Sequence, residues 1–451
     1  MKIRKLQLKN IGVFDDETIE FHPCPAKDKA EIHIFTGQNG SGKSTILMAL
    51  AGLFNPDFAH ENHNKGFSTP FFKRFRHNPS DEKNFNSLTE LNKHIDNLPD
   101  IVEGLFENNK KTEIKVQRSK ESNILTTRSA TEDYGEILKG KETKLKYAVF
   151  AYSGYRQIKS EDIEAIKEPK KFNPLSQSLE FVKDYSQTNQ LSINQLIANN
   201  ISKSAIEKNR SQEKSVKFAN VIKSIEKAIF EITDWNISFD LETEPTNLIT
   251  KINGKELDFD VLPDGLRSLI SWIADLLGRV DLLRWQDDLP IFEKNLILLL
   301  DEIEVHLHPA WQRKVLPVVQ KLFKNSQIFV STHSPFVVNS VDDAWVYKLE
   351  LENGKAKVAE IVESENSNSI TQVLREIFDV EEWFGLEVQN KLDRFEELRD
   401  KILSNGSNEK DESELLDKAR ELAEEPNDQL KQIIRRELQQ LSEIKNKPFT
   451  I

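Results

Sequence analysis

The sequence predicts an α/β fold in which a mixed β-sheet is flanked by helices. Three mostly apolar runs, EIHIFT, NLILLL and SQIFVST, are typical of strands buried on both faces of a sheet. A glycine-rich segment follows the first run, two acidic residues follow the second, and a histidine follows the third. In a parallel sheet the carboxyl ends of the strands lie at one edge, so these polar residues are expected to meet there.

The composition is that of an ordinary globular protein, with 38% hydrophobic and 30% charged residues. A chain of 451 residues suggests about two or three domains, and its one cysteine, Cys24, excludes an internal disulfide and fits a reducing compartment. The N-terminus alternates polar and apolar residues, and no long apolar run follows. We therefore expect a cytoplasmic protein with no membrane partner. The net charge of -12 argues against a protein that coats DNA.

Residues 1–160 are predicted to form a first lobe with an antiparallel β subdomain. KIRKLQL and ETIEF near the N-terminus, and TEIKVQRS and NILTTRS further along, alternate as strands do. Residues 110–146 contain ten Lys or Arg and six Asp or Glu, and FFKRFRH at 71–77 combines basic and aromatic residues. Such features are typical of solvated loops and strand faces, and a contact with DNA, RNA or a protein partner remains the alternative.

The rest of the chain divides into three predicted regions. Residues 161–235 read as a polar helical insertion, whose heptad pattern is too short for long coiled-coil arms. Residues 236–350 form the second lobe, and 351–451 form a helical region for partner binding or oligomerisation. In that region SNGSNEKDES, residues 404–413, predicts a loop between two helices. Trp383 and Phe384 favour packing in a core, with a docking surface as the alternative.

The glycine-rich segment GQNGSGKS matches G-x-x-x-x-G-K-[ST] at every fixed position. Its glycines let backbone N–H groups close around phosphate oxygens, while the next helix presents its N-terminus to the negative charge. We expect Lys43 to contact the β and γ phosphates of ATP, and the Ser44 hydroxyl to ligate Mg²⁺. The predicted nucleotide-binding residues are Gly37, Asn39, Gly40, Ser41, Gly42, Lys43, Ser44 and Thr45.

The segment DEIEVHLHP, residues 301–309, directly follows an apolar strand. That context predicts Asp301 as the Walker B ligand of Mg²⁺ and Glu302 as the base that polarises the attacking water. His306 and His308 also suggest a zinc or iron site, but two ligands from one turn need others, and no matching His or Cys cluster occurs in the sequence. Magnesium is therefore the expected metal.

His333 lies just past the third apolar run, in STHSP. A histidine at the end of a strand beside Walker B can reach a γ-phosphate and its attacking water. We therefore predict a catalytic role for His333, with a surface-loop histidine as the alternative.

The order of these motifs resembles the ABC-type ATPases that include the SMC, RecF and OLD-type proteins. The resemblance implies an ABC-type P-loop NTPase head, with a signature helix through which one subunit covers the nucleotide of another. LPDGLRSLISWIADL is the candidate, and Gly265 would contact the nucleotide in trans. Pro263 stands where serine is usual, which removes a hydroxyl and predicts slow or regulated hydrolysis. The Q-loop, a further metal contact, is implied at Gln157, with Arg156 as the rival.

The chain further resembles the PtuA group of ATPases from Septu-type and retron-linked antiphage systems. LPDGLRSLISWIADLL, DEIEVHLHP, STHSPFVVNS and the charged helical tail carry this resemblance. It implies a homo-oligomer of head-to-head ATPase dimers, in which Glu304, His306 and His308 form a D-loop facing the partner subunit or its nucleotide. It also implies a partner HNH nuclease, PtuB, that ATP binding and hydrolysis regulate.

Three other functions fit parts of the sequence. An OLD-type nuclease needs a Toprim domain with a glutamate after one strand and D-x-D after another, and no D-x-D on a strand follows Ser340. We therefore expect no nuclease activity in this chain. A DNA-repair ATPase of the RecF or SMC kind would bind DNA in an ATP-dependent manner without a nuclease. A transporter subunit fits the motifs but not the insertions or the tail.

Overall fold

The computed structural model describes residues 1–24, 28–54, 74, 100–118, 124–130, 144–154, 193–243, 246–380, 384–405 and 408–451. Two compact units make up the chain, Met1–Phe378 and Asp379–Ile451. The C-terminal region predicted at 351–451 begins within a β-hairpin of the first unit, because residues 345–352 pair with residues 355–363. Among the described helices, none is long and apolar enough to cross a membrane.

A six-stranded mixed sheet lies at the centre of the first unit, in the order β14-β13-β3-β12-β11-β7. Its strands are β3 (Glu31–Gly37), β7 (Ala148–Tyr152), β11 (Leu296–Leu300), β12 (Gln327–Ser331), β13 (Trp345–Glu352) and β14 (Lys355–Glu363). All neighbours pair in parallel except β14, which is antiparallel to β13. Every residue of β7, β11 and β12 is buried, as their apolar sequences predict. The carboxyl ends of β3, β11 and β12 therefore share one edge.

A five-stranded antiparallel sheet forms the predicted β subdomain, in the order β2-β1-β4-β5-β6. Its strands are β1 (Ile3–Ile11), β2 (Phe14–Glu20), β4 (Asp100–Phe106), β5 (Lys111–Arg118) and β6 (Ile124–Ala130). Helix α1 (Lys43–Gly52) contacts β1 of this sheet and four strands of the central sheet. The helix that follows the glycine-rich loop is thus fixed between the two sheets.

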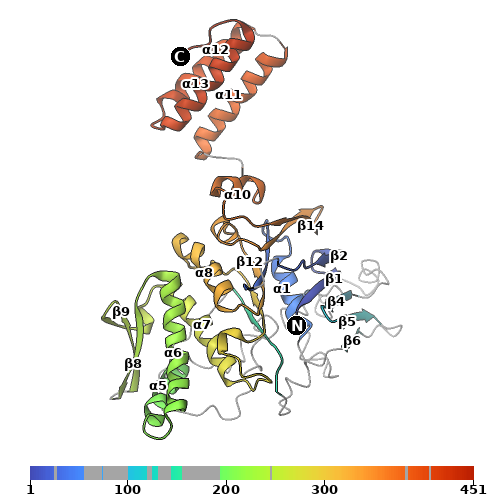
Figure 1. Cartoon of the computed structure of the whole chain (residues 1–451). Coiled ribbons are helices and arrows are strands. Elements are labelled where there is room, and N and C mark those ends of the chain that lie inside the picture. Colours follow the sequence, from blue (N-terminus) through green and yellow to red (C-terminus); the bar gives the residue numbers. More distant parts are fainter. Residues whose placement is uncertain are drawn as a thin grey trace, which may run out of the picture. The chain divides into compact units, whose positions relative to one another are not determined.

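A helical hairpin and a small sheet form the flank of the first unit (Figure 1). The hairpin consists of α5 (Ile193–Glu207) and α6 (Gln212–Thr233), and the sheet of β8 (Ile237–Thr243), β9 (Thr246–Ile252) and β10 (Lys255–Asp258). The predicted second lobe begins with this sheet. Within the described part of the chain its three strands pair in antiparallel fashion with one another and join neither of the other two sheets. The 3₁₀ turns Phe259–Val261 and Ile291–Glu293 and the helices α7 (Asp264–Leu282), α8 (Pro309–Leu322), α9 (Pro335–Val338) and α10 (Ile370–Glu376) complete the unit.

The second unit consists of α11 (Leu386–Asn405), α12 (Glu409–Glu424) and α13 (Asp428–Lys445) around an apolar core of its own. The predicted loop at 404–413 is shorter in the structure, because Asn408 accepts the Asp411 N–H at 2.7 Å and starts α12 there. A further helix start at Asn427, which accepts the Leu430 N–H at 3.1 Å, divides the predicted second helix. Phe384 packs partly buried against this core, and Trp383 lies outside the described residues.

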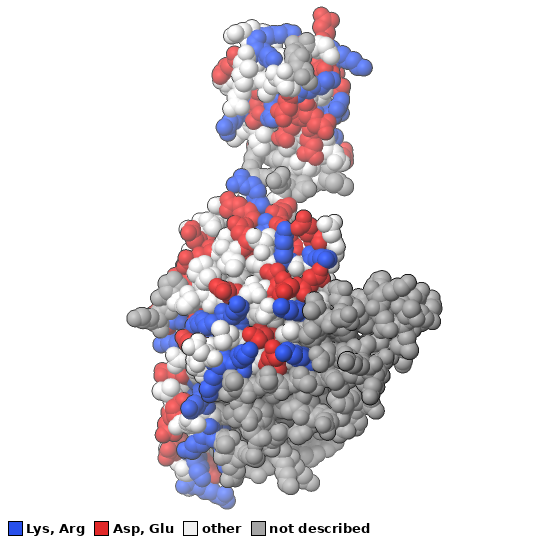
Figure 2. All heavy atoms as spheres, turned by 90° about the vertical axis from the view of Figure 1, so that its right-hand side faces the viewer, with Lys and Arg blue, Asp and Glu red and all other residues white. Residues whose placement is uncertain are grey.

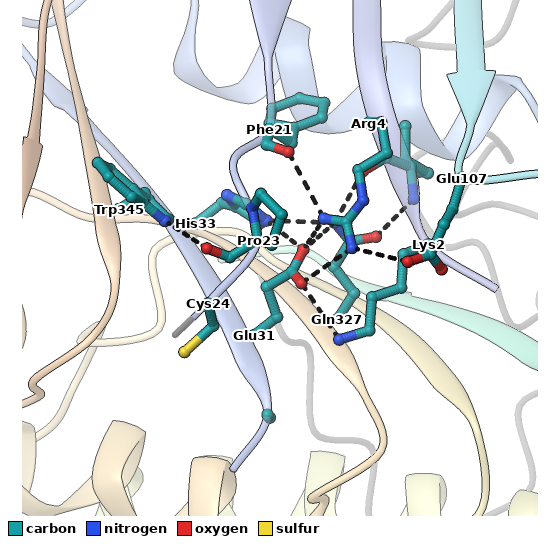
Figure 3. Close-up of polar contacts among 12 residues, drawn as sticks. Lys2, Arg4, Phe21, Pro23, Cys24, Glu31, His33, Glu107, Gln327 and Trp345 are labelled. Carbon is teal, nitrogen blue, oxygen red and sulfur yellow. Dashed lines mark hydrogen bonds and ion pairs between the residues drawn. The ribbon is translucent and has the colours of Figure 1, made fainter. Parts of the chain in front are cut away.

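A group of buried and partly buried polar side chains, here called the polar clamp, ties β1 to the amino ends of β3 and β12 (Figure 3). It consists of Lys2, Arg4, Glu31, His33 and Gln327. The Glu31 carboxylate is 2% exposed and accepts hydrogen bonds from Arg4 at 2.6 Å and from Gln327 at 2.8 Å. Burial alone would raise the pKa of Glu31, but the hydrogen bonds from His33 and Arg4 outweigh it and lower the pKa to about 2.

Candidate phosphate-binding and hydrolysis site

The glycine-rich loop joins the carboxyl end of β3 to α1, and left-handed backbone at three glycines shapes it. The φ angles are +140° at Gly37, +85° at Gly40 and +94° at Gly42. A Cβ at Gly37 would lie 2.2 Å from the Leu349 carbonyl oxygen, and one at Gly42 would lie 2.5 Å from the Phe14 ring. A Cβ at Gly40 would meet nothing within 4 Å. The loop therefore packs tightly at both ends and is open in the middle, as a phosphate cradle must be.

Lys43 is the first residue of α1, and its side chain folds back to the start of the glycine-rich loop. Its side chain is 6% exposed, and Nζ donates to the carbonyl oxygens of Gly37 and Gln38, each at 2.9 Å. Burial lowers the pKa of Lys43 to about 8, although the nearby carboxylates of Asp301 and Glu302 favour the charged form. A buried ammonium beside the loop opening is suited to phosphate oxygens.

Two oxygens of the predicted magnesium site converge from opposite sides. The Ser44 hydroxyl, on α1, donates to Asp301 Oδ1 at 3.1 Å, and Asp301 is 7% exposed at the end of β11. The Ser331 hydroxyl, at the end of β12, also donates to Asp301 Oδ1 and accepts the Glu302 N–H at 2.9 Å. A hydroxyl and a carboxylate at the phosphate loop are the oxygen ligands that Mg²⁺ prefers, so Ser44 and Asp301 fit that ion.

The alternative of a zinc or iron site depends on further ligands lying near His306 and His308. Within the described ranges, no group of three or more His, Cys, Asp or Glu side chains gathers as metal ligands would. His306 and His308 are both exposed, and His308 Nδ1 accepts the Ala310 N–H at 3.2 Å to cap α8. His308 therefore has a structural role at the start of a helix.

Glu302, the predicted base, depends on a glycine that the sequence analysis missed. Gly154 follows β7, and a Cβ there would lie 2.8 Å from Glu302 Oε2 and 3.0 Å from Glu302 Cβ. Glu302 itself adopts a left-handed φ of +46°. The Glu302 side chain therefore packs directly against the Gly154 backbone, and any larger residue at position 154 would displace that side chain. The sequence signal is a glycine placed just after the buried strand AVFAY.

His333 follows β12, at the same edge of the sheet, and its side chain is exposed. Burial of part of the ring lowers the pKa of His333, the Lys43 charge lowers it further, and Asp301 opposes both. The charges of Lys43 and Asp301 therefore both influence the pKa of the His333 imidazole. The His333 N–H donates to Glu304 Oε1 at 2.6 Å, so the Glu304 carboxylate, expected to face a second subunit, is engaged within its own chain.

The predicted signature helix is α7, which starts just after Pro263. Pro263 and Asp264 are exposed, and the Asp264 carboxylate pairs with Arg267. Gly265 is buried, and a Cβ there would lie 2.3 Å from the His306 carbonyl oxygen. Gly265 therefore allows the turn after Walker B to pass close to α7 in the same chain. Its contact with the nucleotide of a second copy stays a prediction.

Arg74 is a second residue that the sequence analysis did not place at the site. Its guanidinium donates to Thr45 Oγ1 at 2.7 Å and to Met48 Sδ at 2.9 Å, and its carbonyl accepts the Gly12 N–H at 2.7 Å. Burial lowers the pKa of Arg74, and the charge of Asp301 opposes that effect. A cation from the predicted basic cluster 71–77 therefore lies against α1, while the rest of that cluster lies outside the described residues.

The Q-loop candidates Gln157 and Arg156 also lie outside the described residues. Asn39, which was predicted to bind nucleotide, is exposed in the loop, and Ser41 is buried beneath it. The structure thus brings together the loop, Asp301, Glu302 and His333, and leaves the Q-loop prediction as it stood.

Residues 32–339, more than half of the chain, match the family described as "AAA domain, putative AbiEii toxin, Type IV TA system". The chain belongs to this family. The loop, the Walker B strand and His333 all lie within the matched residues. The family agrees with the enzyme class predicted from the sequence, a P-loop ATPase.

Proteins that are similar in sequence include two retron proteins and a Septu protein. The Retron Ec83 probable ATPase of Escherichia coli is 32% identical over 132 residues, covering 29% of this chain and 24% of that protein. The Retron Vc95 probable ATPase of Vibrio cholerae is 26% identical over 378 residues, 75% and 72% of the two chains. The Septu protein PtuA of Bacillus thuringiensis is 28% identical over 138 residues, 28% and 35%. The predicted resemblance to PtuA-like ATPases of defence systems is confirmed.

Solved structures that are similar to this chain include SMC heads. The SMC head domain from Thermotoga maritima has a TM-score of 0.41 and 16% identity, covering 81% of this chain and 100% of that one. The SmcHead bound to the C-winged helix domain of ScpA has a TM-score of 0.45 and 14% identity, covering 81% and 99%. The structure confirms the predicted α/β fold, with a mixed sheet flanked by helices, an antiparallel β subdomain and a helical C-terminal region.

Proposed function

We propose that this chain is an ABC-type ATPase that binds and hydrolyses ATP between two copies of itself and thereby regulates an HNH nuclease of the PtuB type in antiphage defence. The observation that supports the chemistry best is the approach of Ser44 Oγ to Asp301 Oδ1, 3.1 Å, beside the open glycine loop. A hydroxyl and a carboxylate placed in this way are typical of phosphoryl-transfer sites.

The chain's own residues account for most of the proposed reaction. The loop N–H groups and Lys43 hold the phosphates, while Ser44 and Asp301 would hold Mg²⁺, which when bound offsets charge on the β and γ phosphate oxygens. Glu302 orients the attacking water and accepts its proton, with Gly154 leaving room for the carboxylate. His333 contacts the γ-phosphate from the neighbouring strand end.

In this proposal, the start of α7 covers the nucleotide of a second copy. The first N–H groups of a helix have no partner within the helix, so those at Asp264 and Gly265 can turn to a phosphate. Pro263 supplies no hydroxyl, and the negative Asp264 would repel the phosphate. Its ion pair with Arg267 offsets part of that repulsion. A weakened contact of this kind predicts slow hydrolysis that a partner can regulate.

The names of the relatives support the defence role, and the partner nuclease is inferred from the PtuA resemblance. The C-terminal helical unit is the proposed surface for oligomerisation or partner binding. Contact with DNA or RNA remains the alternative for the basic segments. On the face in Figure 2, Lys and Arg are interspersed with Asp and Glu over the described surface.

The decisive experiment co-expresses the chain with an HNH nuclease of the PtuB type and measures complex formation, nuclease activity and phage resistance. Wild type should form a complex, and Glu302→Gln should retain ATP, slow its hydrolysis by about 100-fold or more, and change nuclease control. If the purified chain cleaves DNA with Mg²⁺ and no partner, the proposed nuclease partner is wrong. ATP-dependent DNA binding without any nuclease partner would instead identify a repair-type ATPase.

A further inference from the structure

Two side chains connect the turn after Walker B to the segment that carries His333. Glu304 Oε1 accepts the His333 N–H at 2.6 Å. Gln312, on α8, donates from Nε2 to the Leu307 carbonyl oxygen at 2.8 Å, and its Oε1 accepts the Ser334 hydroxyl at 2.6 Å. The turn and the histidine segment are therefore bridged at two adjacent residues, His333 and Ser334.

We infer that Glu304 and Gln312 are positioning residues that hold His333 at a fixed place relative to Glu302. This inference rests on the proposed function, in which both residues act on the γ-phosphate and its water. Neither Glu304 nor Gln312 needs to touch the nucleotide, because each acts on backbone or on a neighbouring hydroxyl.

The turn needs such support because its backbone is strained. Glu302 and His306 adopt left-handed φ angles of +46° and +65°, which are unfavourable for residues with a side chain. Ile303 and Leu307, which are 0% and 5% exposed, anchor the turn in the core. With these apolar anchors fixed, Glu304 can reach across to the next strand end.

The second bridge fixes the start of a helix. The Ser334 hydroxyl accepts the N–H groups of Phe336 and Val337 at 3.1 and 3.3 Å, which caps α9. Its own proton goes to Gln312. The Ser334 hydroxyl is thus fixed both by Gln312 and by the start of α9. Together with the bond from the His333 N–H to Glu304, this restrains the backbone at residues 333 and 334.

Charge at Glu304 is a competing explanation, and the structure allows it to be separated from hydrogen bonding. Burial raises the pKa of Glu304, whereas the His333 N–H and the Thr332 hydroxyl favour its ionised form. Glutamine keeps a carbonyl oxygen that can accept the His333 N–H but carries no charge. Alanine removes both properties.

The test compares Glu304→Ala with Glu304→Gln. Glu304→Ala should lower kcat about 100-fold, as expected when a reacting group loses its alignment, while KM and ATP affinity stay within about twofold. Glu304→Gln should stay within about threefold of wild type in kcat. Glu363→Ala, at an exposed position on β14, is the matched control and should change neither. Equal impairment by Ala and Gln, or full activity of the Ala variant, would overturn the inference.

A double mutant separates positioning from an independent effect. If Glu304 acts through His333, the variant lacking both side chains should be no slower than His333→Ala alone. Additive losses would contradict the inference and leave the proposed function standing.

Hydrogen exchange gives a readout that does not depend on hydrolysis. In the full-length protein, the His333 amide should be protected, and Glu304→Ala should speed its exchange by at least about tenfold without lowering protection elsewhere in the sheet. If the His333 amide exchanges at the same rate in Glu304→Ala as in wild type, the bridge from Glu304 to His333 is refuted, whatever the ATPase activity of the variant. Absence of hydrolysis in wild type with protected exchange would refute the proposed function and keep the bridge.

Discussion

A buried ionisable side chain lies near each end of strand β3, and the two surroundings have opposite effects on the charged forms of these side chains. At the amino end, Glu31 is surrounded by the donors of the polar clamp, and its pKa falls to about 2 (Figure 3). At the carboxyl end, Lys43 lies beneath the glycine loop, and burial lowers its pKa to about 8. The fold therefore favours the charged form of Glu31 and disfavours the charged form of Lys43.

We propose that this difference separates a charge that stabilises the fold, on Glu31, from a charge that binds a ligand, on Lys43. A carboxylate whose partners are all supplied by the chain stabilises the native state and offers nothing to a ligand. A buried ammonium whose charge is disfavoured gains when an anion arrives. Substitutions at the amino end should therefore change stability, and those at the carboxyl end should change nucleotide binding.

The largest expected effect is at Lys43. Lys43→Ala should abolish measurable ATP binding in calorimetry, because the buried cation at the phosphate site is lost. Thermal stability should be unchanged or higher, since burial disfavours the charged amine at neutral pH. Binding as tight as in wild type would contradict the assignment of the loop.

The converse change is at the polar clamp. Glu31→Ala should lower the free energy of unfolding by about 1–3 kcal/mol, because it leaves the buried amide of Gln327 and the partly exposed Lys2 and Arg4 without their acceptor. ATP affinity should stay within about twofold of wild type. Glu107→Ala is the control, since Glu107 also bonds Arg4 but is 58% exposed. If Glu31→Ala loses ATP binding at temperatures where it remains folded, the amino end of β3 also contributes to binding, and the proposed division between the two ends is wrong.

A smaller effect is expected at Gly154, which tests the catalytic end without removing a charge. Gly154→Ala should lower kcat about tenfold or more, because its Cβ would displace Glu302. ATP binding should be retained. Gly385→Ala is the control, because a Cβ there meets nothing within 4 Å. Wild-type turnover in Gly154→Ala would show that the position of Glu302 is not critical.

The smallest effect is a pH dependence of the polar clamp. The pKa of Glu31 is lowered from 4.5 to about 2 on folding, so its contribution is complete above pH 4.5 and declines as the pH falls toward 2. The difference in unfolding free energy between wild type and Glu31→Gln should therefore narrow over that window in denaturant titrations. A difference that is constant from pH 6 to pH 3 would show that the charge of Glu31 contributes little.

Local patterns in the sequence were sufficient to predict the buried strands and the places of the glycine loop, the acidic pair and His333 along the chain. The glycine spacing of the loop, the apolar strands before Asp301 and His333, and the acidic pair after β11 each depend on neighbours along the chain. Backbone conformation and strand burial arise from such neighbours, which is why the sequence predicted the buried strands and the glycine loop between β3 and α1.

Contacts between distant segments were decided only by the tertiary structure. Gly154 beside Glu302, Arg74 against Thr45, and the bridge from Glu304 to His333 each join separate elements. The polar clamp is the clearest case, because Arg4 and Glu31 look like ordinary surface charges in the sequence. Alternating patterns indicate which residues face inward, but they do not indicate which buried groups will meet, since that depends on how the two sheets pack.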